Sequence, residues 1–212
     1  MQLSRRRFLA AATGGLAATS GCLDMVLGEE QSFEATAAEV GAAALGETNY
    51  EHLETEANTI SETFEIQGNE RTVTLTNYIS TYQRMVDIPG IGEQPAAVFA
   101  TLSTPKFEIL GRTLNPIAEV EKEELAKRAQ DSYGSLRVKE LLGTQQVDVL
   151  GAAHELATFS GIAELASTEF DVHLDIGTVP HEKDIVVLFG GYPAEMQGEA
   201  ENILTMVRGV TH

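Results

Sequence analysis

The chain has 212 residues, with 14 basic and 32 acidic side chains and a formal net charge of −18. This charge argues against nucleic acid and anionic lipid surfaces as partners, because both are bound through basic patches. The single cysteine, Cys22, leaves no pair for a disulfide, so a hydrophobic core must hold the fold. The length fits one domain, and no cofactor is expected.

The first 21 residues predict an export signal. A basic stretch that includes Arg5 and Arg6 is followed by an apolar run over residues 8–18. That run is shorter than the roughly 20 residues that span a bilayer as a helix, so the segment is expected to be removed. The consecutive arginines before Phe8-Leu9 are typical of a twin-arginine signal, which implies the twin-arginine translocase as a partner during export.

Small residues directly before Cys22 predict a lipidation site. Thr19-Ser20-Gly21 precedes this cysteine in the manner of a lipobox, where the chain is cut and the thiol receives a lipid. The alternative is an ordinary signal peptide with a leftover thiol. We expect a lipoprotein anchored through Cys22 on the extracellular face of the cell membrane. Residues 22–31 form a tether, and residues 32–212 form the domain.

The acidic balance predicts a protein that folds in molar salt. Cleavage before Cys22 removes three arginines and no acidic residue, so the net charge changes from −18 to −21. Such a charge destabilises a compact chain by self-repulsion, whereas salt near 1 M screens charges beyond about 3 Å. Periodic apolar segments argue against the alternative, an acidic disordered chain.

The first half of the domain predicts one helix and several strands. A capping-box spacing from Thr36 to Glu39 predicts a helix over residues 37–45. Two alternating segments, which flank a polar turn, predict a hairpin. The strands are expected over residues 50–66, 71–84, 96–103 and 106–114, with a loop over 87–94.

The second half predicts two helices and four strands. Residues 116–133 carry an apolar stripe and two i,i+4 pairs, Glu123–Lys127 and Glu124–Arg128, which favour a helix. The C-terminal segment repeats helical periodicity up to Gly209, where the helix should end. The strands are expected over residues 147–150, 155–160, 169–176 and 184–189, and the last helix over 194–208. The fold class is therefore α+β, a mainly antiparallel sheet flanked by about three helices in a single domain.

Several short segments resemble a family of haloarchaeal twin-arginine-exported lipoproteins that is known only as a domain of unknown function. The similar stretches are the arginine signal with Gly21-Cys22, residues 73–82 and 98–105, residues 111–116, Leu150-Gly151, and Tyr192-Pro193 before the last helix. The resemblance implies a location and no activity. The final hairpin, Tyr192-Pro193 and helix also resemble PsbP-like domains in architecture, and those are mostly accessory and binding proteins.

One strand carries a weak candidate for a metal site. Asp171, His173 and Asp175 alternate along residues 169–176 and share one face, and imidazole with carboxylates suits a divalent metal. Alternate residues of a strand are too far apart for all three to hold one ion. A solvated face of an acidic strand is the simpler interpretation, so no metal is expected.

Two further features have a structural and a functional interpretation. Asn77 falls on the apolar face of its strand, so its amide must bond either to backbone or to a ligand. Gly190-Gly191 before a helix is similar to a phosphate-binding loop, but the flanking pattern of such loops is absent. The five histidines are scattered along the chain.

Two classes of function remain open at this point. The absence of a local catalytic motif favours a non-enzymatic binding or accessory module, with an envelope protein partner or a small molecule as its ligand. The alternative is a hydrolase or metal-dependent enzyme whose residues are dispersed in the sequence. An enzyme should have a pocket with converging polar groups of shifted pKa.

Overall fold

A computed structural model describes residues 31–66, 69–88, 92–109, 112–113, 117, 120–132, 135–165 and 168–212. The predicted signal with Arg5 and Arg6, and the predicted lipidation site Cys22, lie outside the described residues. Among the helices that are described, none is long and apolar enough to cross a membrane.

One large sheet organises the domain, and its strands follow one another as two meanders. The first meander joins β3, β4 and β5, and the second joins β8, β9, β10 and β11. The two meet where β11 pairs with β5, with Gly190 opposite Phe99. The bounds are β3 Glu51–Ile66, β4 Asn69–Ile88, β5 Gly92–Pro105, β8 Leu136–Val149, β9 Ala152–Leu165, β10 Thr168–His181 and β11 Asp184–Pro193.

The sheet is mixed, which corrects the expectation of a mainly antiparallel sheet in one respect. A short first strand, β1 (Gln31–Glu34), pairs with β4 in parallel. It continues the line of β5 along β4, beyond the point where β5 ends. All the other pairings of the large sheet are antiparallel. The tether was expected to reach residue 31, but Gln31 already lies in β1.

Tight turns fix the register of the second meander. Leu150 and Gly151 join β8 to β9, and both have positive φ, 51° and 82°, as the mirror-image turns of hairpins require. Glu182-Lys183 joins β10 to β11, and Glu182 has a φ of 44°. With two-residue turns, the hydrophobic alternation of each strand decides which face its side chains occupy.

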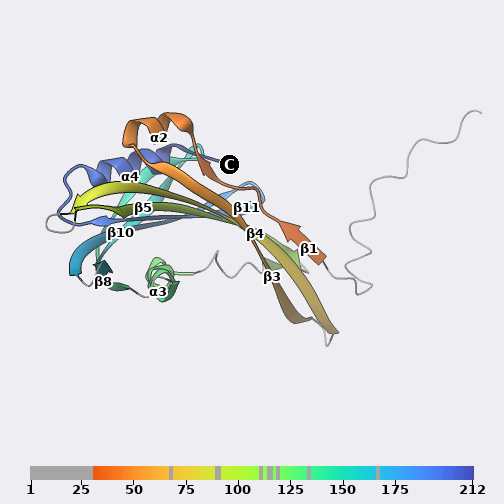
Figure 1. The fold of residues 1–212 in the computed structure, drawn as a ribbon. Helices are drawn as coiled ribbons and strands as arrows, with labels where there is room; N and C mark the ends of the chain where they lie inside the picture. Colours follow the sequence, from red (N-terminus) through yellow and green to blue (C-terminus); the bar gives the residue numbers. More distant parts are fainter. Residues whose placement is uncertain are drawn as a thin grey trace, which may run out of the picture.

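Three described helices cover the two faces of the sheet. Helices α2 (Ala42–Thr48) and α4 (Glu199–Arg208) pack together over one face, which we call the α4 face. Helix α3 (Lys122–Ser132) lies against the opposite face, which we call the α3 face (Figure 1). The main core lies on the α4 face and includes Tyr82, Phe99, Leu188, Ile203 and Met206. A second core on the α3 face includes Ala126, Phe159 and Leu174.

Gly190 shows how closely α4 approaches the sheet. A Cβ atom at this glycine would lie only 2.8 Å from Cγ2 of Ile203, which is closer than packed carbon atoms come. Gly190 therefore has a packing role on this face, which accounts for a glycine here without a bound phosphate.

Several expected elements have different bounds in the structure. The helix predicted over residues 37–45 was wrong at its start, since Glu39–Val40 forms a short strand, β2, paired with β12 (Val210–Thr211). The predicted strand over residues 106–114 is two short strands, β6 (Glu108–Ile109) and β7 (Arg112–Thr113). The last two predicted helices begin later, at Lys122 and Glu199.

Candidate functional site

The α3 face of the sheet presents an apolar floor built from three neighbouring strands. In β5, β10 and β11 every second side chain points to this face, because residues alternate along a strand. Helix α3 covers only part of the floor. Two hollows remain, one beside α3 and one beneath it.

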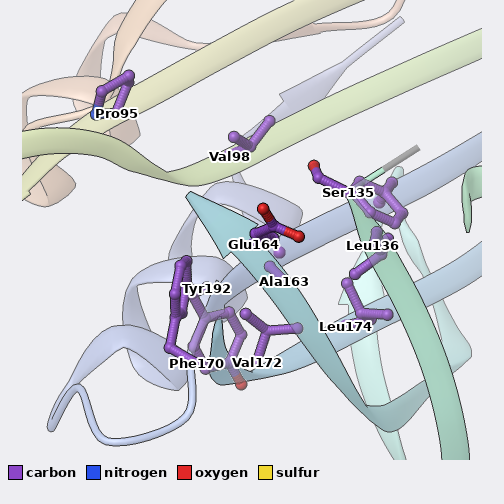
Figure 2. Close-up of a pocket in the computed structure, with 12 residues that line it drawn as sticks. Pro95, Val98, Ser135, Leu136, Ala163, Glu164, Phe170, Val172, Leu174 and Tyr192 are labelled. Atoms are coloured by element: carbon purple, nitrogen blue, oxygen red, sulfur yellow. The ribbon is translucent and has the colours of Figure 1, made fainter. Parts of the chain in front are cut away.

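The first hollow has a volume of about 220 Å³ and lies where β8 begins and β9 ends. Phe170 and Val172 of β10 and Gly191 of β11 form part of its wall. Side chains of β8, β9 and β10 lie across the hollow from Pro95 and Val98 of β5 (Figure 2). Polar groups are few among the described residues of its lining, and the charged group among them is the carboxylate of Glu164.

The second hollow has a volume of about 370 Å³ and lies between α3 and the sheet. Leu125 and Ala129 of α3 form one wall, and Leu102, Ile176 and Val187 belong to the sheet side. The charged group at this hollow is Arg128, which pairs with Glu124 at 3.5 Å as the sequence predicted.

Phe189 of β11 connects the two hollows, because its side chain lines both of them. Neither lining contains a histidine, a cysteine or an aspartate among its described residues. The hydroxyl of Tyr192 is no base, because burial and the neighbouring carboxyl of Asp175 raise its pKa above the ordinary value. The described lining of both hollows is therefore mostly apolar, which suits an apolar molecule.

Asp171, His173 and Asp175 do share one face of β10, as the sequence predicted, but each has its own surroundings. Asp171 is exposed and lies 3.6 Å from the ammonium of Lys139. The ring of His173 packs edge-on against Tyr192 at 5.7 Å. Asp175 is buried rather than solvated, and the hydroxyl of Thr158 donates a hydrogen bond to it. The weak candidate for a metal site on this strand, and the expectation that it holds no metal, both remain untested.

Asp175, the third of these residues on β10, has a shifted pKa. Burial raises its pKa, and this outweighs the hydrogen bonds from Thr158 and Tyr192 and the charge of His173, which act in the other direction. The group belongs to the packing between sheet and α4 and does not open into either hollow.

Asn77 is buried on β4, as its place on the apolar face predicted, and its Oδ1 atom has no hydrogen-bond partner among the described residues. It does not line either hollow. The structure therefore gives no support to a ligand-facing role for this amide.

A second buried carboxylate, Glu199 at the start of α4, is completely enclosed. Its Oε1 accepts hydrogen bonds from the hydroxyl of Tyr50 at 2.8 Å and from Nε of Arg84 at 3.2 Å, and Arg84 also forms an ion pair with Oε2. The amide of Asn202 donates to Oε2. Burial and the adjacent Glu199 raise the pKa of Tyr50, so its hydroxyl remains a donor.

The structure also brings together residues that the sequence left scattered. His181 ends β10, and His212 follows β12, yet their Nδ1 atoms are 2.9 Å apart. Their separation by 31 positions hides this pair from any local motif search. The sequence signal for this site was limited to the stretch between the strands expected over residues 169–176 and 184–189, which holds His181.

A mixed sheet with helices on both of its faces, and with apolar hollows on one face, defines a layered α+β domain with room for a small ligand. The chain belongs to the family described as a domain of unknown function (DUF6517), whose model matches residues 37–211. No curated protein matches the chain. The resemblance to an uncharacterised domain family is therefore confirmed at this level.

Proposed function

We propose that this protein is a non-enzymatic lipoprotein of a halophilic archaeon, anchored outside the cell membrane, that binds a small uncharged apolar molecule on the α3 face. The observation that carries the binding role is the pair of hollows that share Phe189. Ligand cavities commonly measure about 300–1,000 Å³, and the larger hollow, at about 370 Å³, lies within that range.

The chemistry of the lining supports an uncharged ligand. Apolar side chains dominate both hollows, and among the described lining residues the charged ones are Glu164 and Arg128. The net charge of −18 repels anions from the whole molecule. Binding would then rest on apolar area removed from water, which stabilises a complex by about 25 cal/mol per Å² before the cost of association.

The same lining argues against the alternative of a hydrolase or metal-dependent enzyme. Among the described residues of the hollows, no nucleophile is paired with a base, and Tyr192 has its pKa raised, which disfavours a phenolate. Catalytic groups normally have a pKa shifted toward the working pH. The two groups with a raised pKa nearest the hollow are the carboxyl of Asp175 and the phenol of Tyr192, and they form a hydrogen bond with each other instead.

The location rests on the N-terminal sequence. Arg5 and Arg6 support export by the twin-arginine translocase, and Gly21-Cys22 supports lipidation. Two acyl chains, which a lipobox anchor usually carries, hold a protein stably on a membrane, whereas one holds it marginally. The proposed likeness to PsbP-like domains, which rests on β10, β11 and α4, fits a binding or accessory role.

The experiment uses the Cys22→Ser chain, which should be released in unlipidated form and can be purified in molar KCl without detergent. A neutral solvatochromic dye such as Nile red is titrated into it, and organic extracts of the freshly purified protein are analysed by mass spectrometry. We expect saturable dye binding near one equivalent and an apolar compound in the extract.

A matched variant makes the test specific. Gly191→Val places two methyl groups into the first hollow from a strand position whose φ is not left-handed, so the fold should be kept. Dye affinity should fall at least tenfold. If this variant and the parent chain bind the dye equally, or if neither binds it, the binding proposal is wrong.

A further inference from the structure

We propose that His181, Glu182 and His212 form a binding site for one transition-metal ion of the zinc type, at the opposite end of β11 from Gly191. One donor atom from each of the three residues lies within 4.8 Å of the other two. A tetrahedral zinc ion with bonds of about 2.0–2.2 Å requires its ligand atoms to be this close.

The fold builds the site from two segments that are distant in sequence. The β10–β11 turn places His181 and Glu182 side by side at one end of the sheet. The pairing of β12 with β2, with Thr211 opposite Glu39, brings the last residues back over the same end. The Nδ1 atoms of His181 and His212 consequently face each other at 2.9 Å, within hydrogen-bond distance. Two nitrogens on one tetrahedral zinc ion lie about 3.3 Å apart, so a small shift of the rings would replace this hydrogen bond by two bonds to a metal ion.

A buried carboxylate behind the site supplies the outer support that metal-binding histidines normally have. Asp184 is fully buried, and its Oδ2 lies 3.1 Å from Nε2 of His212 while accepting the backbone N–H of Thr36 at 2.7 Å. This places the acceptor on the Nε2 side of His212 and leaves Nδ1 to a metal ion. A carboxylate–imidazole–metal arrangement of this kind fixes the ring and its tautomer.

Two polar atoms here lack hydrogen-bond partners among the described residues, namely Oδ1 of Asp184 and Nε2 of His212. The contact between Nε2 and Oδ2 is close, but it is poorly aligned for a hydrogen bond. Enclosed polar atoms without partners are destabilising. A cation on Nδ1 would strengthen the N–H of Nε2 as a donor toward the carboxyl of Asp184.

The identity of the turn residue is a further sign of function. Glu182 has a φ of 44°, in the left-handed region that glycine and asparagine favour. Glutamate is disfavoured in this conformation, and its exposed side chain gains no burial in return. A metal bond from its carboxylate accounts for a residue that turn chemistry alone disfavours.

The ligand set selects the class of ion. Two imidazole nitrogens and one carboxylate suit zinc, copper, nickel or iron rather than calcium or magnesium, which prefer oxygen ligands. We commit to zinc as the ion to test. The ion would clamp β12 to the β10–β11 turn, and three protein ligands would leave one position for water.

The test uses the exported protein purified without a histidine tag, stripped with a chelator and titrated with Zn²⁺ in one fixed molar salt. We expect one ion per chain with a Kd below micromolar. His212→Ala and His181→Ala should weaken binding at least 100-fold, and Asp184→Asn about 10- to 100-fold. The exposed His52 lies on β3, away from this end, so His52→Ala should bind as the parent does.

Glu182→Asn tests whether Glu182 binds the metal ion or has only a structural role in the turn. Asparagine tolerates the left-handed turn, so the metal-free variant should unfold at the same or higher urea concentration than the parent. Its zinc affinity should nevertheless fall at least tenfold, and the visible ligand-field bands of the Co²⁺ form should change. Absence of binding below millimolar zinc, or affinity unchanged by both His212→Ala and Glu182→Asn, overturns the site.

Discussion

Two adjacent glycines of β11 allow a direct test of how the two faces of the sheet are packed. Gly190 points toward α4, where a Cβ atom would lie 2.8 Å from Cγ2 of Ile203. Gly191 points toward the first hollow, where a Cβ atom would come no closer than 3.5 Å to any atom, the nearest being a ring carbon of Phe189. The perturbation is a pair of single changes, Gly190→Ala and Gly191→Ala.

The expected magnitudes follow from these distances. Each change removes a glycine from a strand interior, which favours folding by about 0.5–1 kcal/mol. At Gly191 the added methyl group comes into ordinary van der Waals contact with Phe189 and Leu174 and gains up to about 0.8 kcal/mol more from burial. At Gly190 the methyl group must displace Ile203, and overpacking of this kind costs about 1–3 kcal/mol. The backbone contribution is common to both, so the two variants should differ by about 2–4 kcal/mol.

The assay is equilibrium urea unfolding in molar KCl, followed by circular dichroism. The free energy of unfolding of a small protein falls by about 1–3 kcal/mol per M urea, so the urea midpoint should rise measurably for Gly191→Ala and fall for Gly190→Ala. Equal shifts in the same direction would refute the reasoning, because they would mean that the backbone alone decides the effect. A lower midpoint for Gly191→Ala would show that the first hollow is not free space.

Three other predictions test the buried charges and the surface. Arg84→Met leaves Glu199 enclosed with only Tyr50 and Asn202 as partners, so urea unfolding should show a loss of about 3 kcal/mol, and adding Glu199→Gln should restore part of it. Burial raises the pKa of Asp175, so its carboxyl favours folding in the protonated form, and that advantage is lost as pH rises above about 4 toward the raised value. The stability of Asp175→Asn relative to the parent should therefore increase with pH over this window, and a decrease would contradict the assignment. Transfer of the mature chain from molar to 0.1 M KCl lengthens the Debye length from about 3 to 10 Å, and circular dichroism should then show unfolding, whereas an unchanged spectrum would argue against salt-dependent folding.

The sequence predicted best those segments whose hydrophobic pattern agreed with their turns. The hairpin of β3 and β4 was expected at residues 50–66 and 71–84, and the structure pairs the two strands as far as Ile66 and Asn69. The alternation in β10 correctly placed Val172, Leu174 and Ile176 on one face. Both cases combine a period of two with a polar turn, so that local and long-range preferences coincide.

Edge strands and the chain ends were missed because they carry little hydrophobic pattern. Most of β8 is exposed between its buried ends, Leu136 and Val147, so only residues 147–150 were expected as a strand. The pairs β1–β4 and β2–β12 depend on contacts between distant segments. Thr36 and Glu39 had the spacing of a capping box, but the backbone N–H of Thr36 bonds to Asp184 instead. Tertiary contacts override such local preferences.

The candidate sites were even less accessible from the sequence. One hollow lies beside α3 and the other lies between α3 and the sheet, and both depend on packing that no local pattern records. Asp175 looked like one of several acids on a solvated strand, yet the covering α4 buries it. His181 and His212 meet only because β12 returns to β2. Periodicity can assign a side chain to a face, but it does not determine what covers that face.

The two faces of the sheet therefore have different physical properties. On the α4 face, Gly190 lets Ile203 of α4 pack closely against the sheet, and an ion pair joins Arg84 of β4 to the buried Glu199 of α4. Displacement of α4 would break this ion pair and leave both charges without their partner. On the α3 face, Leu125 and Ala129 of α3 lie over a hollow, and these two side chains are apolar and carry no charge.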